Sequence, residues 1–96
     1  MGLLHYDNVA SFEFDDRLLT HLRTVIFSKL NLQESLVLTW VDQGRQRSIW
    51  LHPTVPLQFE FDDEVTPEIN AAWIEQLLAL ANSATGLRIE PEPESE

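Results

Sequence analysis

The stretch SLVLTWVDQGRQRSIWLHPTVPLQFEF, residues 35–61, decides the fold of this chain. It contains three runs with the apolar, aromatic and β-branched residues of strands, at residues 35–42, 45–52 and 57–61. A Gln-Gly pair separates the first two runs. Two prolines bracket the connection to the third run. They favour a tight turn there, because proline inside a central strand would remove a ladder hydrogen bond. The stretch predicts three consecutive strands, and no catalytic or cofactor motif interrupts them.

An N-terminal hairpin and a helix are expected before this stretch. Residues 3–6 and 9–14 read as two short strands joined by an Asp-Asn turn. A helix then begins at Asp15 or Asp16, since acidic residues favour a helix start, and its apolar stripe continues to about Leu30.

A second helix and a last strand are expected after the stretch. Thr66 is the predicted N-cap and Pro67 the first helical residue, and the helix ends near Ser83 because Gly86 is a stop signal. Residues 87–90 are then a candidate short strand.

The order β-β-α-β-β-β-α-β predicts an α+β domain over residues 1–90. We expect a single, largely antiparallel sheet with both helices packed on one face. Residues 91–96, PEPESE, cannot offset the entropy of ordering, so we predict a disordered acidic tail.

The composition excludes several classes of protein. The net charge is −10, from sixteen acidic and six basic residues, and such a surface repels nucleic acid. Cysteine is absent, which removes disulfides and thiolate chemistry. No window has the length of apolar sequence that a membrane span needs, and the first residues lack the features of a signal peptide. We therefore expect a cytoplasmic protein.

One face of the predicted sheet is left uncovered by the two helices. Its mixture of a large aromatic, two valines and polar residues is typical of an interface. We expect this candidate surface to bind a second copy of the chain or another protein, and the alternative is that Trp50 packs beneath the tail or a loop. Its predicted members are Val37, Thr39, Val41, Ser48, Trp50, His52, Gln58 and Glu60.

The sequence offers few groups for catalysis or ligand binding. The three histidines lack metal-site spacing, the paired acids before each helix are interpreted as caps, and three glycines cannot build a nucleotide-binding loop. We expect no enzyme activity, metal or cofactor. Arg45, Arg47 and Asn70 are weak candidates for a ligand site, although Asn70 is better explained by a bond to nearby backbone.

Four segments carry a resemblance that spans nearly the whole chain: DDRLLTHL at 15–22, WLHPTVPLQFEF at 50–61, INAAWIEQL at 69–77 and GLRIEPEP at 86–93. They resemble a family of small actinobacterial proteins of unknown function, many of which are labelled ATP-dependent DNA ligase. Such a ligase needs a lysine nucleophile in a K-x-D-G setting, whereas the one lysine here, Lys29, stands in SKLNL at a predicted helix end. The resemblance therefore implies a free-standing small protein without a known activity.

Three functional hypotheses follow. The first is a non-enzymatic interaction module that uses the face around Trp50 and His52. The second is an acidic accessory factor in DNA metabolism that contacts a basic protein through its carboxylates. The third is a small enzyme or ligand binder near Trp50, His52, Arg47 and Asn70.

Overall fold

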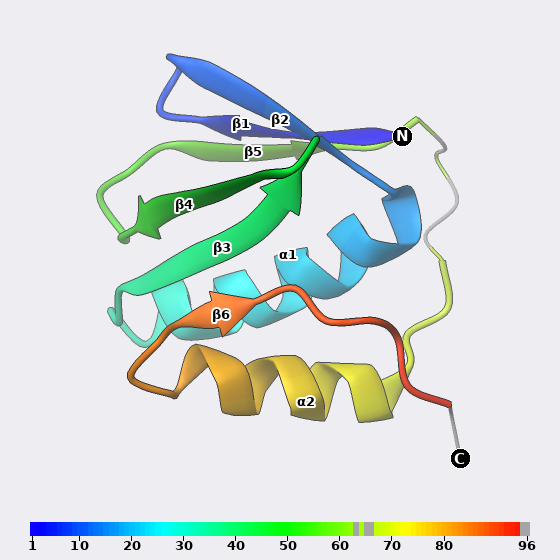
Figure 1. The fold of residues 1–96 in the computed structure, drawn as a ribbon. Coiled ribbons are helices and arrows are strands. Elements are labelled where there is room, and N and C mark those ends of the chain that lie inside the picture. Colours follow the sequence, from blue (N-terminus) through cyan, green and yellow to red (C-terminus); the bar gives the residue numbers. More distant parts are fainter. Residues whose placement is uncertain (63, 65–66, 95–96) are drawn as a thin grey trace.

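The computed structural model describes residues 1–62, 64 and 67–94. These described residues form two helices and six strands, which confirms the α+β class. Figure 1 shows α1 lying between the sheet that contains β1 and the second helix, α2. In chain order the elements are β1 (Gly2–Tyr6), β2 (Ala10–Phe14), α1 (Asp16–Asn31), β3 (Leu36–Asp42), β4 (Arg45–Leu51), β5 (Leu57–Glu60), α2 (Ala71–Ala81) and β6 (Leu87–Arg88).

The strands form two sheets of three strands, so the prediction of a single sheet is wrong. Their orders are β2-β1-β5 and β4-β3-β6, with every pair antiparallel except β3 and β6. The chain changes sheets in the proline-bracketed connection between β4 and β5, where β5 turns to pair with β1. The Asp7 N–H donates to Pro56 O (2.9 Å), and the Tyr6 hydroxyl donates to Trp50 O (2.7 Å). These bonds hold the β1–β2 hairpin against that connection.

Both sheets turn their apolar faces toward one shared core. Leu4 of β1 and Leu38 of β3 are fully buried there, as are Leu19 and Leu22 of α1. The Trp40 ring makes edge-to-face contacts with two phenylalanines of β2, at centroid distances of 5.0 and 5.2 Å. Because side chains alternate along a strand, the odd-numbered residues of β3 and the even-numbered residues of β4 point to the opposite, outer face.

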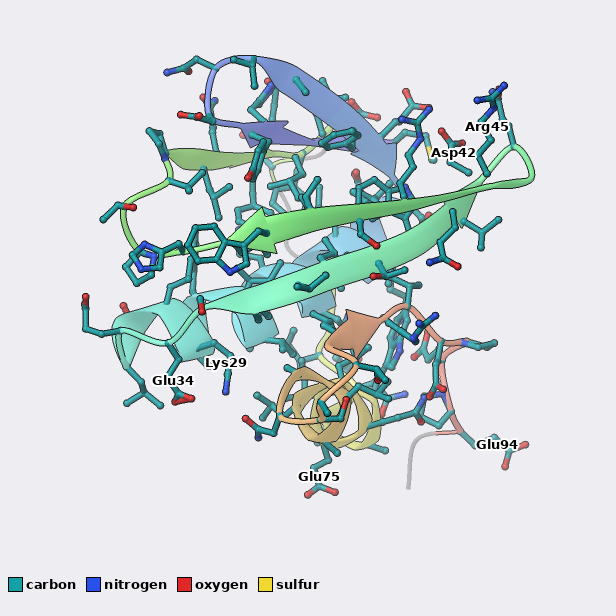
Figure 2. All side chains as sticks on the ribbon, turned by 60° about the vertical axis from the view of Figure 1, so that its left-hand side comes forward. Lys29, Glu34, Asp42, Arg45, Glu75 and Glu94 are labelled. Atoms are coloured by element: carbon teal, nitrogen blue, oxygen red, sulfur yellow. The ribbon has the colours of Figure 1, made fainter. Side chains whose placement is uncertain are left out.

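Helix α1 matches the prediction closely. Asp15 is its N-cap and accepts a hydrogen bond from the Leu18 N–H (3.3 Å). Lys29, in the last turn, is only 7% exposed, and its ammonium donates to Glu34 (2.8 Å) and to the Asn82 side chain after α2. Figure 2 shows Lys29 and Glu34 side by side at this corner. Lys29 therefore ties the ends of the two helices together.

Helix α2 begins four residues later than predicted. Its N-cap is Asn70, whose side-chain oxygen accepts from the N–H groups of Ala72 (3.1 Å) and Trp73 (3.4 Å). Pro67 lies before the helix, so its predicted place as the first helical residue is wrong, and Thr66 falls outside the described residues. An asparagine amide satisfies two orphan N–H groups at once, which explains why the helix starts there.

Candidate functional site

The outer face of β3 and β4 carries most of the predicted surface. Val37 lies opposite Trp50 in the strand register, and the Trp50 ring stacks on His52 with centroids 4.9 Å apart. Trp50 is 52% exposed and Val41 is 71% exposed. We call Val37, Val41, Trp50 and His52 the Trp50 patch.

Two of the predicted members form a polar pair at the middle of this face. The hydroxyls of Thr39 and Ser48 are 2.8 Å apart, and Thr39 is buried while Ser48 is exposed. Thr39 also pairs with Arg88 of β6, which places β6 along that side of β3. The accessible part of the face is therefore narrower than predicted and centres on the exposed strand β4.

Gln58 and Glu60 do not belong to this surface. They lie on the outer face of the other sheet, where Gln58 is opposite His5 in the register. The prediction grouped them with Trp50 because it assumed that β4 and β5 are neighbours in one sheet. Since β5 pairs with β1, the predicted surface divides between two sheets.

A hydrogen-bonded chain that the sequence did not reveal joins three of the strands on this second face. His5 Nδ1 is 2.7 Å from the Ser11 hydroxyl, and His5 Nε2 is 2.9 Å from the Glu60 carboxylate. His5 and Ser11 border a hollow of about 360 Å³ that Asn8 and Gln58 also line. A hydroxyl, an imidazole and a carboxylate in series can relay a proton. Here the Glu60 side chain is 57% exposed, so water screens its charge and weakens its electrostatic interaction with the His5 imidazole.

The weak ligand candidates are not brought together. Arg47 forms an ion pair with Asp42 (3.3 Å) across the β3–β4 hairpin, and Figure 2 shows Arg45 at the tip of the same hairpin. Gln43 and Gly44 form its turn with φ of 52° and 77°, as a two-residue hairpin turn requires. Asn70 instead caps α2, and its side-chain oxygen accepts hydrogen bonds from nearby backbone N–H groups, as expected from the sequence.

Asn70 also belongs to a cluster that holds the C-terminal segment. The Arg17 guanidinium makes two hydrogen bonds to the Glu92 carboxylate (2.7 and 2.5 Å), and the Asn70 amide donates to Glu92 and to Pro93 O (both 2.9 Å). The Trp73 indole and the Gln76 amide donate to the segment at Glu90 (3.2 and 2.8 Å). We call these four donor residues, Arg17, Asn70, Trp73 and Gln76, the Arg17 site.

These contacts change the charge behaviour of Glu92. Hydrogen bonds from Arg17 and then from Asn70 lower its carboxyl pKa from 4.5 to about 2. The hydrogen bonds to Glu92 raise the pKa of the Arg17 guanidinium. Glu92 and Pro93 thus lie against the helices, within the segment 91–96 that was predicted to be a disordered tail, and residues 95 and 96 fall outside the described part of the chain.

Comparison with known proteins shows one family relationship. A family model described as "Domain of unknown function (DUF7882)" matches residues 1–92. The chain belongs to this family. No curated protein and no solved structure matches it. The range that defines the DUF7882 domain contains both the Trp50 patch and the contact between Arg17 and Glu92.

The described part of this DUF7882 domain lacks two general features. Within residues 1–62, 64 and 67–94, no group of three or more histidine and acidic side chains is arranged to hold a metal ion. Neither described helix combines the length and the apolar character needed to cross a membrane.

Proposed function

We propose that this DUF7882 domain is a cytoplasmic, non-enzymatic protein-interaction module whose working surface is the Trp50 patch. The supporting observation is a tryptophan that is half exposed, stacked on His52, opposite Val37 in the strand register and on the same face as the exposed Val41. Burying the exposed half of an indole removes about 100 Å² from water, which corresponds to about 2.5 kcal/mol. Tryptophan is also enriched among the residues that dominate binding energy.

The occupant that we propose is a second copy of the chain. The chain as a whole carries a charge of −10, but none of the four residues of the patch is acidic. Two copies can therefore meet through this patch without setting carboxylates of the patch against one another. A two-fold interface of this kind uses the same surface on both copies, so Trp50 and the valines of one copy would face those of the other.

The test compares two substitutions that add the same charge. Trp50→Glu places a carboxylate in the patch, and Val9→Glu places one at the β1–β2 turn, where the valine is 77% exposed. Light scattering coupled to size-exclusion chromatography measures the mass of each, and circular dichroism checks the fold. We expect a wild-type dimer, a Val9→Glu dimer and a folded Trp50→Glu monomer. A wild-type monomer rejects self-association through this surface.

A second candidate function comes from the charge and the resemblance to ligase-labelled actinobacterial proteins. An acidic accessory factor in DNA metabolism would bind a basic protein through its carboxylates, with no ligase activity of its own. The buried state of Lys29, with its ammonium bonded to Glu34 and Asn82, supports the second part of that hypothesis. Salt separates the two functions, because apolar association through Trp50 survives high salt whereas contact through exposed carboxylates weakens.

A further inference from the structure

Arg17 and Asn70, the two residues of the Arg17 site that bind Glu92, are held in place by bonds that do not involve the C-terminal segment. Arg17 Nη1 donates to Glu68 O (2.9 Å), and Arg17 O accepts from His21 Nδ1 (2.7 Å). Because a carbonyl oxygen only accepts, the proton is on Nδ1, and Nε2 of the buried His21 accepts the Asn70 N–H (2.9 Å). The Asn70 side-chain oxygen is engaged by the first turn of α2. These supports of Arg17 and Asn70 remain when the segment leaves.

The segment itself is held by polar bonds, of which those from Arg17 lie at the surface and those from Asn70 are partly buried. Glu90, Pro91 and Glu92 are exposed, and the two partners of the ion pair, Arg17 and Glu92, have side chains 39% and 30% exposed. Water can replace these bonds one at a time, so release of residues 90–93 does not require opening of the apolar core. The contact is consequently exchangeable.

The site also has a defined chemical preference. The planar guanidinium of Arg17 matches a carboxylate with two parallel hydrogen bonds, and the Asn70 amide adds a third bond to it and one to the following carbonyl. The Gln76 side-chain amide donates a hydrogen bond to the carboxylate of Glu90, two residues before Glu92. The prolines between and after these acids favour an extended conformation, which lowers the entropy lost on binding. Together these contacts select an acidic segment of the pattern Glu-Pro-Glu-Pro.

We propose that the Arg17 site is a receptor for an acidic, proline-alternating peptide segment of a partner protein, and that residues 90–93 fill it as an intramolecular competitor. A tethered segment acts at an effective concentration on the order of millimolar. The partner's apparent affinity is reduced in proportion to the fraction of sites that are vacant. This proposal does not depend on the Trp50 patch, because its test measures peptide binding at the Arg17 site.

The test uses the full chain with one carboxylate neutralised. Glu92→Gln removes the anion that Arg17 binds, whereas Glu94→Gln makes the same charge change at a residue that projects away from both helices (Figure 2). The probe is a fluorescein-labelled peptide of sequence RIEPEPE, which copies residues 88–94, and the control peptide is RIEPQPE. Fluorescence anisotropy measures binding, and circular dichroism checks that each variant is folded.

We expect Glu92→Gln to bind RIEPEPE at least tenfold more tightly than the wild type and Glu94→Gln do, given a competitor at about millimolar effective concentration. The variant should prefer RIEPEPE over RIEPQPE, and adding Arg17→Gln should abolish that preference. If Glu92→Gln does not fold, the wild type must still show the preference at higher protein concentration. Equal binding of the two peptides overturns the proposal. A wild-type dimer that Glu92→Gln converts to a monomer also overturns it, because the segment would then come from a second copy.

Discussion

Asn70 has two roles that substitutions can separate. Its side-chain oxygen caps α2, and its amide nitrogen donates to Glu92 and Pro93. Asn70→Ala removes both roles. Loss of an N-cap costs about 1 kcal/mol, and loss of the amide hydrogen bonds at a buried position adds about 1 kcal/mol. We therefore expect the free energy of unfolding to fall by about 2 kcal/mol.

Asn70→Asp keeps the capping oxygen and removes only the donor. It also places a carboxylate oxygen where the amide nitrogen stood, 2.9 Å from Glu92 Oε2. We expect the helical signal to be retained and the C-terminal segment to detach. Adding Glu92→Gln should then relieve the repulsion, because the glutamine amide can donate to the new carboxylate.

Urea unfolding followed by far-ultraviolet circular dichroism measures all four proteins, and the slope with denaturant checks that unfolding remains two-state. A cost below about 0.5 kcal/mol for Asn70→Ala would refute the capping argument. Failure of Glu92→Gln to relieve Asn70→Asp would refute the assignment of the amide contact to Glu92.

Further substitutions and a pH titration test other parts of the structure. Leu38→Ala should lower the free energy of unfolding by about 3 kcal/mol, measured by urea unfolding, because Leu38 is fully buried. Gly86→Ala should cost about 3 kcal/mol in the same assay, since φ is 83° and the new Cβ would lie 2.8 Å from Val37 O. Gly44→Ala should cost only about 1 kcal/mol, because φ is 77° but nothing lies within 4 Å; equal costs would contradict the steric argument. Because the pKa of Glu92 is lowered from 4.5 to about 2, its stabilising contact should be complete above pH 4.5 and lost as the pH falls toward 2. The NMR signal of the nearby Trp73 indole N–H should follow that transition, and a titration unchanged in Glu92→Gln would contradict it.

Local signals predicted much of the fold. The cap at Asp15 and the apolar stripe of α1 follow directly from helix geometry, and the alternation along β3 placed Val37 and Val41 on the face opposite the core. These features depend on residues near each other in the chain. For the same reason the Gln43-Gly44 turn was predictable.

The errors involve residues that are far apart in the chain. Whether β5 pairs with β4 or β1 depends on competition between whole strands, which the local pattern of residues 52–56 does not decide. The chain of Ser11, His5 and Glu60 exists only because of that pairing. The pairing of β1 with β2 places His5 opposite Ser11. The predicted hairpin was therefore enough to infer the contact between His5 and Ser11, but not the contact with Glu60.

The candidate site was predictable only in part, for the same physical reason. The exposed Trp50 and its neighbour His52 share one strand end, so their proximity could be inferred. The start of α2 was misplaced because Thr66 and Pro67 form a strong local signal, whereas Asn70 gains its advantage from contacts with His21 and Glu92. The contact of Glu92 was missed because the composition of the C-terminal segment does not show that an arginine 75 residues earlier binds it.

The corner that Lys29 forms with Glu34 and Asn82 has a consequence for the lifetime of the protein in a cell. Lys29 is the chain's one lysine, and its amine is buried and bonded to two acceptors. Acylating enzymes and protein-tagging systems that attach to a lysine need an accessible amine, so the folded chain withholds its single attachment point. Only molecules in which this corner has opened present it. Turnover by such a system would therefore select damaged or partly unfolded copies and spare the intact ones.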